Sequence, residues 1–366
     1  MNASLGNLGD RLTGHLHKYA VAMVLVVICV FLSITTTTFL TTGNLTNVLL
    51  QVSMIGIIAM GMTMLLVSGN FDLSVGGIVA FVGVVAAKTV NSSGLAVGII
   101  VGIALGLGLG AVNGFIVTRL RVNSLVATLG SGLAFSGFAL LVANSSPISL
   151  QSAGLRELVK TEWLGVTMPV FVFAAAILTA AWFLHFTVGG REIYAVGANA
   201  DAARYAGVSI DRVRFLPFVI TGGLCALASL ILVGQLNTAL PEAASTWPLQ
   251  VIAAVVVGGV SVAGGRGTIF MAVVGVLLIG VVNNGFNLEN LDVNYQSIFT
   301  GAIIIAAVAL DAFLGKRAAL VASRAAEARD VEVGPRATVD TRAAAGTDQL
   351  RVGNDTPARP PTSLGQ

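Results

Sequence analysis

Long apolar segments alternate with short polar connections along most of this chain. A helix needs roughly 20 apolar residues to cross a bilayer, and by that measure the pattern predicts about ten spans. We expect them at residues 19–40, 45–67, 75–90, 95–118, 122–143, 169–187, 215–236, 249–262, 268–286 and 296–314. The third and the eighth are the shortest. The pattern therefore predicts an all-α, polytopic membrane helix bundle.

Composition agrees with this class. Of the 366 residues, 55% are hydrophobic and only 10% are charged, with a mean hydropathy of +0.90, which is typical of integral membrane proteins. Cys29 and Cys225 both lie in apolar runs, so neither a disulfide framework nor a zinc site is available. A net charge of +3 is too small to indicate a nucleic-acid partner.

Basic residues predict the orientation. The rule that cytoplasmic connections carry the excess of Lys and Arg places both termini inside. We expect residues 1–18 to form a cytoplasmic tail, and residues 316–366, which lack apolar periodicity, to form a disordered one. The predicted inner side carries Arg11, Lys18, Arg119, Arg121, Arg191, Arg204, Arg212, Arg214, Arg266, Lys316 and Arg317, and the outer side carries Lys88, Arg156 and Lys160.

Two spans end alike. Asn113-Gly114-Phe115 closes one span and Asn284-Gly285-Phe286 closes another that runs in the opposite direction. This likeness predicts an inverted-topology repeat of spans two to five and seven to ten, with coincidence of helix composition as the rival explanation. If the repeat holds, the transport path lies between the halves, near Asn113 and Asn284.

Glycines recur every four residues within the segment 95–118, at Gly102, Gly106, Gly110 and Gly114. Such a face lets helix backbones approach closely. We therefore expect this helix to be central in the bundle and not lipid-facing.

The most polar connection covers residues 188–214. Asn199 is a good N-cap, Asp201 and Arg204 suit the first and last turns, and Gly207 lies just past the end. These features predict a two-turn helix with charges that complement its dipole. So short a helix is marginal alone in water. It needs a partner surface, either its own protein or another subunit.

Two glycine-containing connections are candidates for chemistry. In the first, residues 68–77, the Asp72 carboxylate would be costly near membrane depth and is hence a functional candidate. Followed by Leu73 and Ser74, Asp72 also has the form of a helix N-cap at a cytoplasmic break between helices. In the second, residues 255–268, no Lys-Ser or Lys-Thr follows the glycines as a phosphate-binding loop requires. A cytoplasmic turn is the better interpretation, so we expect no ATP hydrolysis by this chain.

The remaining polar groups within the spans are mostly uncharged. Proton coupling is disfavoured because no titratable group lies in the middle of a well-defined span, whereas sodium coupling through backbone carbonyls stays open. No catalytic constellation for a membrane-embedded enzyme is visible. A neutral, hydroxyl-rich solute suits such groups, and the candidate path residues are Asn70, Phe71, Asp72, Asn113, Gln235, Asn283 and Asn284.

Four stretches of the chain resemble one family in their order and spacing. They are LLVSGNFDLSVGGIVA, REIYAVGANADAARYAGVSIDRV, AAVVVGGVSVAGGRGT and GVVNNGFNL. The family comprises the permease subunits of ABC-type importers for ribose, xylose, galactose and related monosaccharides, within the larger group that includes branched-chain amino-acid permeases. Asn70-Phe71 departs from the Gly-Ile that the family usually places before the Asp, which leaves the sugar open.

The resemblance implies a bacterial inner-membrane importer that moves a pentose or hexose by alternating access. It implies a cytoplasmic ATPase subunit that holds ATP and magnesium, an extracytoplasmic sugar-binding protein, and a second permease subunit, identical or not. No cofactor is expected on this chain. The short helix is then similar to the coupling helix that docks on the ATPase and passes its motion to spans six and seven. The coupling residues so implied are Arg191, Glu192, Asn199, Asp201, Arg204, Tyr205 and Gly207.

Overall fold

The computed structural model describes residues 21–292, 294–296, 298–299, 301–303, 305–306 and 309. The predicted tails at 1–18 and 316–366, and much of the predicted span at 296–314, lie outside the described residues. Within the described part, seven helices are long and apolar enough to cross a membrane. The predicted all-α membrane bundle is confirmed, whereas the count of about ten spans and the orientation stay predictions.

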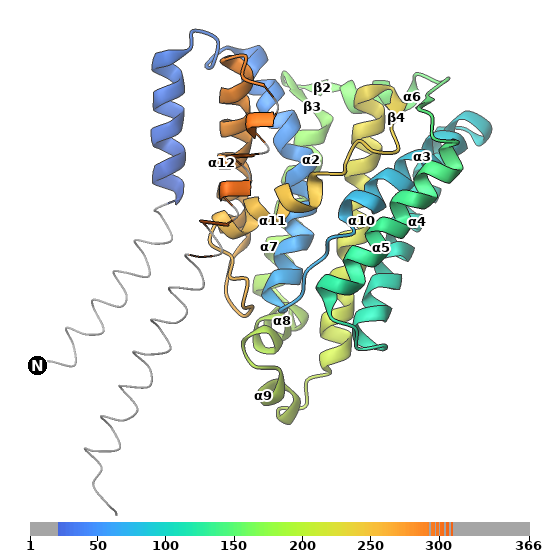
Figure 1. Ribbon diagram of the computed structural model, residues 1–366, viewed down its shortest axis with the longest axis vertical. Coiled ribbons are helices and arrows are strands. Elements are labelled where there is room, and N and C mark those ends of the chain that lie inside the picture. The colour runs from blue at the N-terminus through green and yellow to red at the C-terminus, as the bar shows by residue number, and fades with distance from the viewer. Residues whose placement is uncertain are drawn as a thin grey trace, which may run out of the picture. The chain divides into compact units, whose positions relative to one another are not determined.

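The long helices coincide with the predicted apolar segments two to seven and nine. The first predicted span is a helix over Val21–Thr35 within the described residues. Figure 1 shows the long helices side by side. They are α2 (Thr42–Val67), α3 (Val75–Ser93), α4 (Leu95–Thr118), α5 (Ser124–Ala143), α7 (Met168–Phe186), α10 (Ile210–Leu236) and α12 (Ile269–Leu288).

The eighth predicted span, 249–262, is not one continuous helix. The structure has an eleven-residue helix there, α11 (Trp247–Val257), which at 1.5 Å per residue is only about 16 Å long. The helix ends because the chain turns through glycines: Gly259, Gly264, Gly265 and Gly267 all have positive φ. An irregular loop, 258–268, then leads into α12.

Short elements close the two ends of the bundle. At one end lie α8 (Val188–Ala198) and α9 (Ala200–Tyr205), and this end is called the α9 end below (Figure 1). At the opposite end lie α6 (Gly154–Lys160) and two small antiparallel ribbons. In these, β1 (Ile148–Ser149) pairs with β4 (Thr238–Ala239), and β2 (Glu162–Trp163) pairs with β3 (Val166–Thr167).

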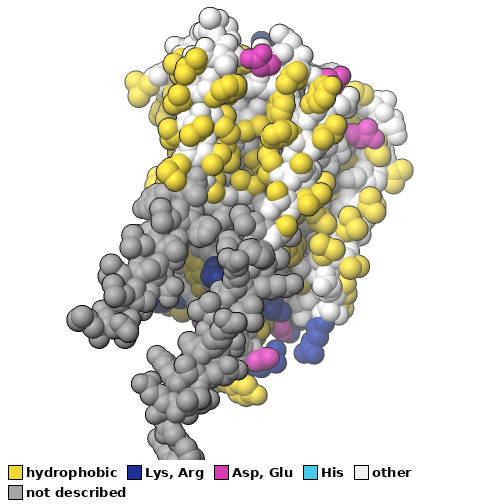
Figure 2. Space-filling model, turned by 60° about the vertical axis from the view of Figure 1, so that its left-hand side comes forward, with side chains coloured by type: hydrophobic (Ala, Val, Ile, Leu, Met, Phe, Trp, Pro, Cys, Tyr) yellow, Lys and Arg dark blue, Asp and Glu magenta, His cyan; other side chains and the backbone are white. Residues whose placement is uncertain are grey.

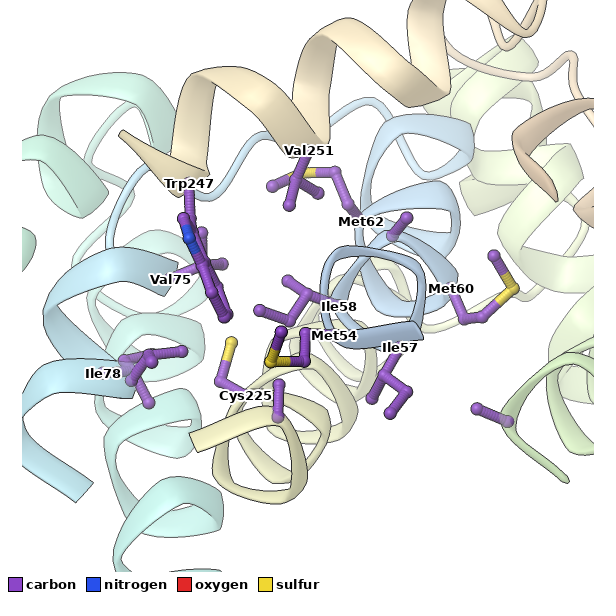
Figure 3. Close-up of a cluster of buried hydrophobic side chains, with 14 of the residues drawn as sticks. Met54, Ile57, Ile58, Met60, Met62, Val75, Ile78, Cys225, Trp247 and Val251 are labelled. Atoms are coloured by element: carbon purple, nitrogen blue, oxygen red, sulfur yellow. The ribbon is translucent and has the colours of Figure 1, made fainter. Parts of the chain in front are cut away.

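The core surrounds α2, whose apolar side chains are buried over most of its length. Figure 3 shows Met54, Ile57 and Ile58 of α2 among side chains from α3, α10 and α11. Burial of such side chains is favourable by about 1.5–3 kcal/mol each when water is the reference, a figure that lipid reduces because its tails are also apolar. Close packing between the helices therefore contributes a larger share of the stability here than removal of apolar surface from water.

The glycine face of α4 packs as expected, but α4 is not a central helix. A Cβ on Gly106 would lie 2.5 Å from the carbonyl oxygen of Gly222 in α10, so the two backbones touch. The other face of α4 is exposed, with Ile100 and Phe115 more than half accessible. The glycine spacing predicted one packed face correctly, yet one face does not make a helix central.

Helix packing has the pattern that an inverted repeat would produce. α2 packs against α11 and α12, and α10 packs against α3 and α4. In the predicted repeat, α2 corresponds to α10, α3 to α11 and α4 to α12. Each first helix therefore packs against the second and third helices of the other half. The repeat itself stays a prediction, and its halves are unequal because α3 has 19 residues and α11 has eleven.

Charged side chains gather at the two ends of the bundle. In Figure 2 hydrophobic side chains cover the flank, and Lys and Arg lie mainly at the α9 end. In the described residues that end carries Arg119, Arg121, Arg191, Arg204, Arg212, Arg214 and Arg266, against Lys88, Arg156 and Lys160 at the opposite end. This asymmetry is the one that the positive-inside rule associates with a cytoplasmic face.

Candidate functional site

Most of the predicted site residues fall into three places, and Gln235 and Asn284 lie outside them. Asn70, Phe71, Asp72 and Asn113 lie around the break between α2 and α3. Asn283 lines a cavity formed by α2, α11 and α12. The predicted coupling residues lie in and around α8 and α9 at one end of the bundle.

The break holds three connected polar side chains, Asp72, Ser74 and Asn113, called the break cluster below. Each of the three is fully buried. Asp72 Oδ1 accepts a hydrogen bond from the Ser74 backbone nitrogen at 2.8 Å and one from Ser74 Oγ at 2.5 Å. Asn113 Nδ2 of α4 donates to Ser74 Oγ at 2.6 Å. The cluster thus ties the start of α3 to α4.

The interpretation of Asp72 as a helix N-cap is wrong. The N-cap of α3 is Ser74, and no side chain caps this helix. Asp72 lies two residues earlier, where its Oδ1 accepts the Ser74 backbone N–H. Its carboxyl group is wholly enclosed by protein and not at a surface. Asp72 Oδ2 and Asn113 Oδ1 are buried without a hydrogen-bond partner among the described residues. Burying a polar atom without a hydrogen bond costs free energy of folding. The packing around the break cluster must therefore offset that cost.

The extended backbone of the break is satisfied by hydroxyl groups of α5. Ser124 Oγ accepts from the Phe71 nitrogen at 3.2 Å, and Thr128 Oγ1 accepts from the Leu73 nitrogen at 2.9 Å. Asn70 turns back onto Ser68 Oγ at 3.0 Å. Irregular backbone at membrane depth is tolerated only where protein or a cavity satisfies it, and α5 does so here.

A cavity of about 220 Å³ lies between α2, α11 and α12. Its polar lining consists of five amide side chains, and none of its lining residues is charged. The polar lining residues are Gln51, Gln250, Asn283, Asn287 and Gln296, and the rest of the wall is Trp247 with Val52, Met54, Ile55, Val276, Ile279 and Gly280. Trp247 and Met54 also belong to the buried cluster of Figure 3, so core and cavity share these two side chains.

Adjacent asparagines of α12 have different surroundings. Asn283 faces the cavity. Asn284 is buried and exchanges two hydrogen bonds with Asn44 of α2, at 2.7 and 3.0 Å. Gln235, near the C-terminus of α10, is not among the cavity residues. The structure therefore brings only Asn283 of the predicted path residues to this cavity.

Four polar cavity residues and Trp247 were not among the predicted site residues. A helical-face pattern carries some of the signal: Trp247 and Gln250 are three residues apart, and Asn283 and Asn287 are four apart. Residues at these spacings share one face of a helix. Nothing in the pattern of one helix shows that these two faces meet Gln51 of α2.

The predicted short helix is confirmed as α9. Asn199 Oδ1 accepts from the Ala202 nitrogen at 2.9 Å, and Gly207 has a φ of +84° just past the end. Ala203 is buried against the protein, whereas Tyr205 is 93% exposed. The Asp201–Arg204 pair, at 3.8 Å, is also exposed and contributes little to stability. α9 thus presents an aromatic ring and two charges at the surface of the chain.

An all-α bundle of long apolar helices defines the class as a polytopic membrane protein. The chain belongs to the family described as the permease component of the branched-chain amino acid transport system, which it matches over residues 44–308. Members of that family are transport permeases, so the chain is a membrane permease and not an enzyme.

The chain is similar to several bacterial sugar permeases. It is 35% identical over 300 residues to the L-arabinose transport system permease protein AraH of Escherichia coli (strain K12), covering 82% of this chain and 92% of the relative. It is 37% identical over 301 residues to the ribose import permease protein RbsC of Bacillus subtilis (strain 168), covering 81% and 94%.

A third relative is the L-arabinose ABC transporter permease protein AraH of Azospirillum brasilense. The identity is 34% over 299 residues, which cover 81% of this chain and 88% of the relative. No solved structure matches the chain.

Proposed function

We propose that this chain forms the path for a neutral monosaccharide, a pentose or a hexose, through a bacterial inner membrane. The observation that carries the proposal is the cavity between α2, α11 and α12, with five amide side chains, a tryptophan and no charged residue in its lining. A ligand pocket typically combines apolar and aromatic walls with a few placed polar groups. This cavity has that composition.

Amide side chains suit sugar hydroxyl groups for a chemical reason. Each amide offers both a donor and an acceptor, as does each hydroxyl, so either partner can reverse its role as the solute moves. The indole of Trp247 supplies an apolar face for the C–H groups of a sugar ring. An anionic or cationic solute would leave its charge unpaired among these residues. The names of the relatives, L-arabinose and ribose permeases, agree with this solute class.

ATP supplies the energy in this proposal. A separate ATPase subunit, which holds ATP and magnesium, docks on the exposed face of α9, where Tyr205 is the natural anchor because exposed aromatic rings often dominate interfaces. The α9 end then faces the cytoplasm. A sugar-binding protein delivers the solute to the opposite end, and a second permease subunit completes the pathway. Transport proceeds by alternating access between two states of the bundle.

The cavity lies in the half of the bundle away from α9. Its α2 residues, Gln51 to Ile55, begin about ten positions into that helix from the opposite end, and α2 reaches the α9 end only at Val67. With α9 in the cytoplasm, the cavity is therefore closer to the side from which a binding protein delivers solute.

The test is uptake by vesicles that contain this chain, its candidate ATPase and its candidate binding protein. We expect ATP-dependent uptake of a neutral pentose or hexose, and no uptake of a uronic acid of the same ring size. Uptake of branched-chain amino acids in place of sugars would overturn the solute class. Uptake by the chain alone, driven by a sodium gradient without ATP, would favour the sodium-coupled carrier instead.

A further inference from the structure

Three segments far apart in the sequence meet backbone to backbone at the α9 end. They are the end of α2 (Val67 to Gly69), the end of α8 (Gly197 and Ala198), and the loop between α11 and α12 (Gly264 and Gly265). We call this contact the glycine junction. We infer that the glycine junction transmits the motion of α9 to the cavity, so that Gly197, Gly264, Gly265 and Tyr194 are positioning residues for transport.

The glycine junction has no room for side chains. A Cβ on Gly197 would overlap the carbonyl oxygen of Val67 and would lie 2.7 Å from the Gly265 nitrogen. A Cβ on Gly265 would lie 2.6 Å from the Ala198 Cα. The Gly265 nitrogen donates to the Val67 oxygen at 2.9 Å. Backbones in direct contact move together, because no flexible side chain between them can absorb a displacement.

The loop conformation requires these glycines. Gly264 and Gly265 have φ values of +88° and +70°, a region that other residues adopt only under strain. A second contact fixes the same loop to α8: Tyr194 donates its hydroxyl to the Gly267 carbonyl oxygen at 2.8 Å. The glycine-rich segment that fails as a phosphate-binding loop is thus accounted for as one side of a backbone joint.

α8 leads directly to α9. Gly197 and Ala198 are the last residues of α8, and Asn199 is both its C-cap and the N-cap of α9. A push on α9 therefore reaches the glycine junction across one residue. This inference rests on the proposed function, because the push on α9 comes from the ATPase subunit proposed to dock there.

The elements that meet α8 at the junction are the ones that line the cavity. α11 and α12 form a closely packed hairpin, because a Cβ on Gly258 would overlap the Met271 carbonyl oxygen and one on Gly275 would overlap that of Ala254. Such a hairpin moves as one body, and it carries Trp247, Gln250 and Asn283 of the cavity wall. α2 carries Gln51 to Ile55 of the wall, which begin about 18 Å from the junction at 1.5 Å for each of the twelve residues from Val67 to Ile55.

This route differs from the one along the chain, which the resemblance alone implied. Through the chain, α8 continues into α7 and α9 continues into α10. Neither α7 nor α10 contributes a residue to the cavity lining. The glycine junction is a shorter, noncovalent connection to the helices that do.

The experiment follows the accessibility of the cavity and not the identity of the solute. In a background without Cys29 and Cys225, Asn283→Cys is labelled with a thiol-reactive methanethiosulfonate, in the reconstituted complex with its ATPase, with and without a non-hydrolysable ATP analogue. We expect the analogue to change the labelling rate in the parent. Gly197→Ala should abolish that change while basal ATP hydrolysis and complex assembly persist.

Two further variants keep the result interpretable. Tyr194→Phe removes one hydrogen bond and keeps the ring, so it should fold and reduce the nucleotide-dependent change by at most about tenfold. Gly108→Ala is the matched control, because a Cβ there meets nothing within 4 Å, and it should behave as the parent.

The outcomes separate the two proposals. No nucleotide effect in the parent would count against the ATP-driven function itself. A normal nucleotide effect in both Gly197→Ala and Tyr194→Phe would overturn the role of the glycine junction and leave the function standing.

Discussion

Two groups of polar side chains lie inside this bundle, and they differ in whether protein encloses them or a cavity borders them. In the break cluster, Asp72, Ser74 and Asn113 bond to one another and are wholly buried. In the cavity, amide groups such as Asn283 and Gln250 border open space. Polarity within an apolar segment therefore does not distinguish a structural joint from a solute path. The surrounding packing makes that distinction.

The contrast is sharpest at two neighbouring positions with the same side chain. Asn283 faces the cavity, and Asn284 pairs with Asn44. One position along a helix rotates a side chain by about 100° at 3.6 residues per turn. That rotation is enough to move an amide group from a solute-facing wall to a helix interface.

The largest expected difference is in chemical accessibility. In a background without Cys29 and Cys225, we expect a methanethiosulfonate reagent to modify Asn283→Cys at least about 100-fold faster than Asn113→Cys, because the buried site must first open locally. The measurement is the labelling rate of the purified chain in detergent. Equal rates would mean that the break cluster is open to solvent and belongs to a path.

Ser74→Ala should lower stability strongly. The change leaves the Asn113 amide without its acceptor and removes one of two donors to Asp72. Each buried polar group that loses its partner costs about 1–3 kcal/mol of stability. Thermal unfolding in detergent measures the loss. Ser53→Ala is the control, since Ser53 is equally buried but bonds only to Leu49 of its own helix. A Ser74→Ala midpoint equal to that of the control would contradict the structural role.

Asn283→Ala should impair transport more than stability. Its amide lines the cavity, so we expect uptake at a limiting monosaccharide concentration to fall by up to about tenfold, the value of one hydrogen bond of roughly 1.4 kcal/mol. The unfolding midpoint should stay close to that of the parent. Full uptake in this variant would place the solute elsewhere.

The smallest effect is expected at the adjacent residue. Asn284→Ala breaks the amide pair with Asn44, and interhelical hydrogen bonds in membranes average about 0.6 kcal/mol with a maximum near 1.7. We expect a slightly lower unfolding midpoint and nearly normal uptake. Asn44→Ala also removes the hydrogen bond from Asn44 Nδ2 to the Phe39 carbonyl oxygen. The double variant should nevertheless lose less than the sum of the two single losses, because both changes break the same amide pair. Additive losses would show that the pair is not coupled.

Much of the local structure could be predicted from the sequence. Apolar runs located α2 to α5, α7, α10 and α12, and the caps of α9 were visible in Asn199 and Gly207. These features depend on residues within one or two turns, so the pattern contains their cause. The eighth span failed because apolar length alone does not show that glycines with positive φ end α11 at Val257.

The candidate site was much less predictable. The residues that form it are close only in space: Asn44 meets Asn284, Gly265 meets Val67, and Asn113 meets Ser74. A face of α11 and a face of α12 each carry a polar pattern, but neither pattern shows where the two faces meet. Glycine spacing likewise predicted that one face of α4 packs closely, but neither its partner α10 nor the exposure of its other face.

The sequence by itself determined the class of this protein, its helical segments and the capped helix at one end, because hydrophobic periodicity and capping are local properties. Only the tertiary structure decided which polar groups face a cavity, which are consumed in the break cluster, and why the second glycine-rich segment lacks side chains. The reason is physical. Close packing between distant segments determines where space remains, and hydrogen bonds between them determine which polar groups are left to meet a solute.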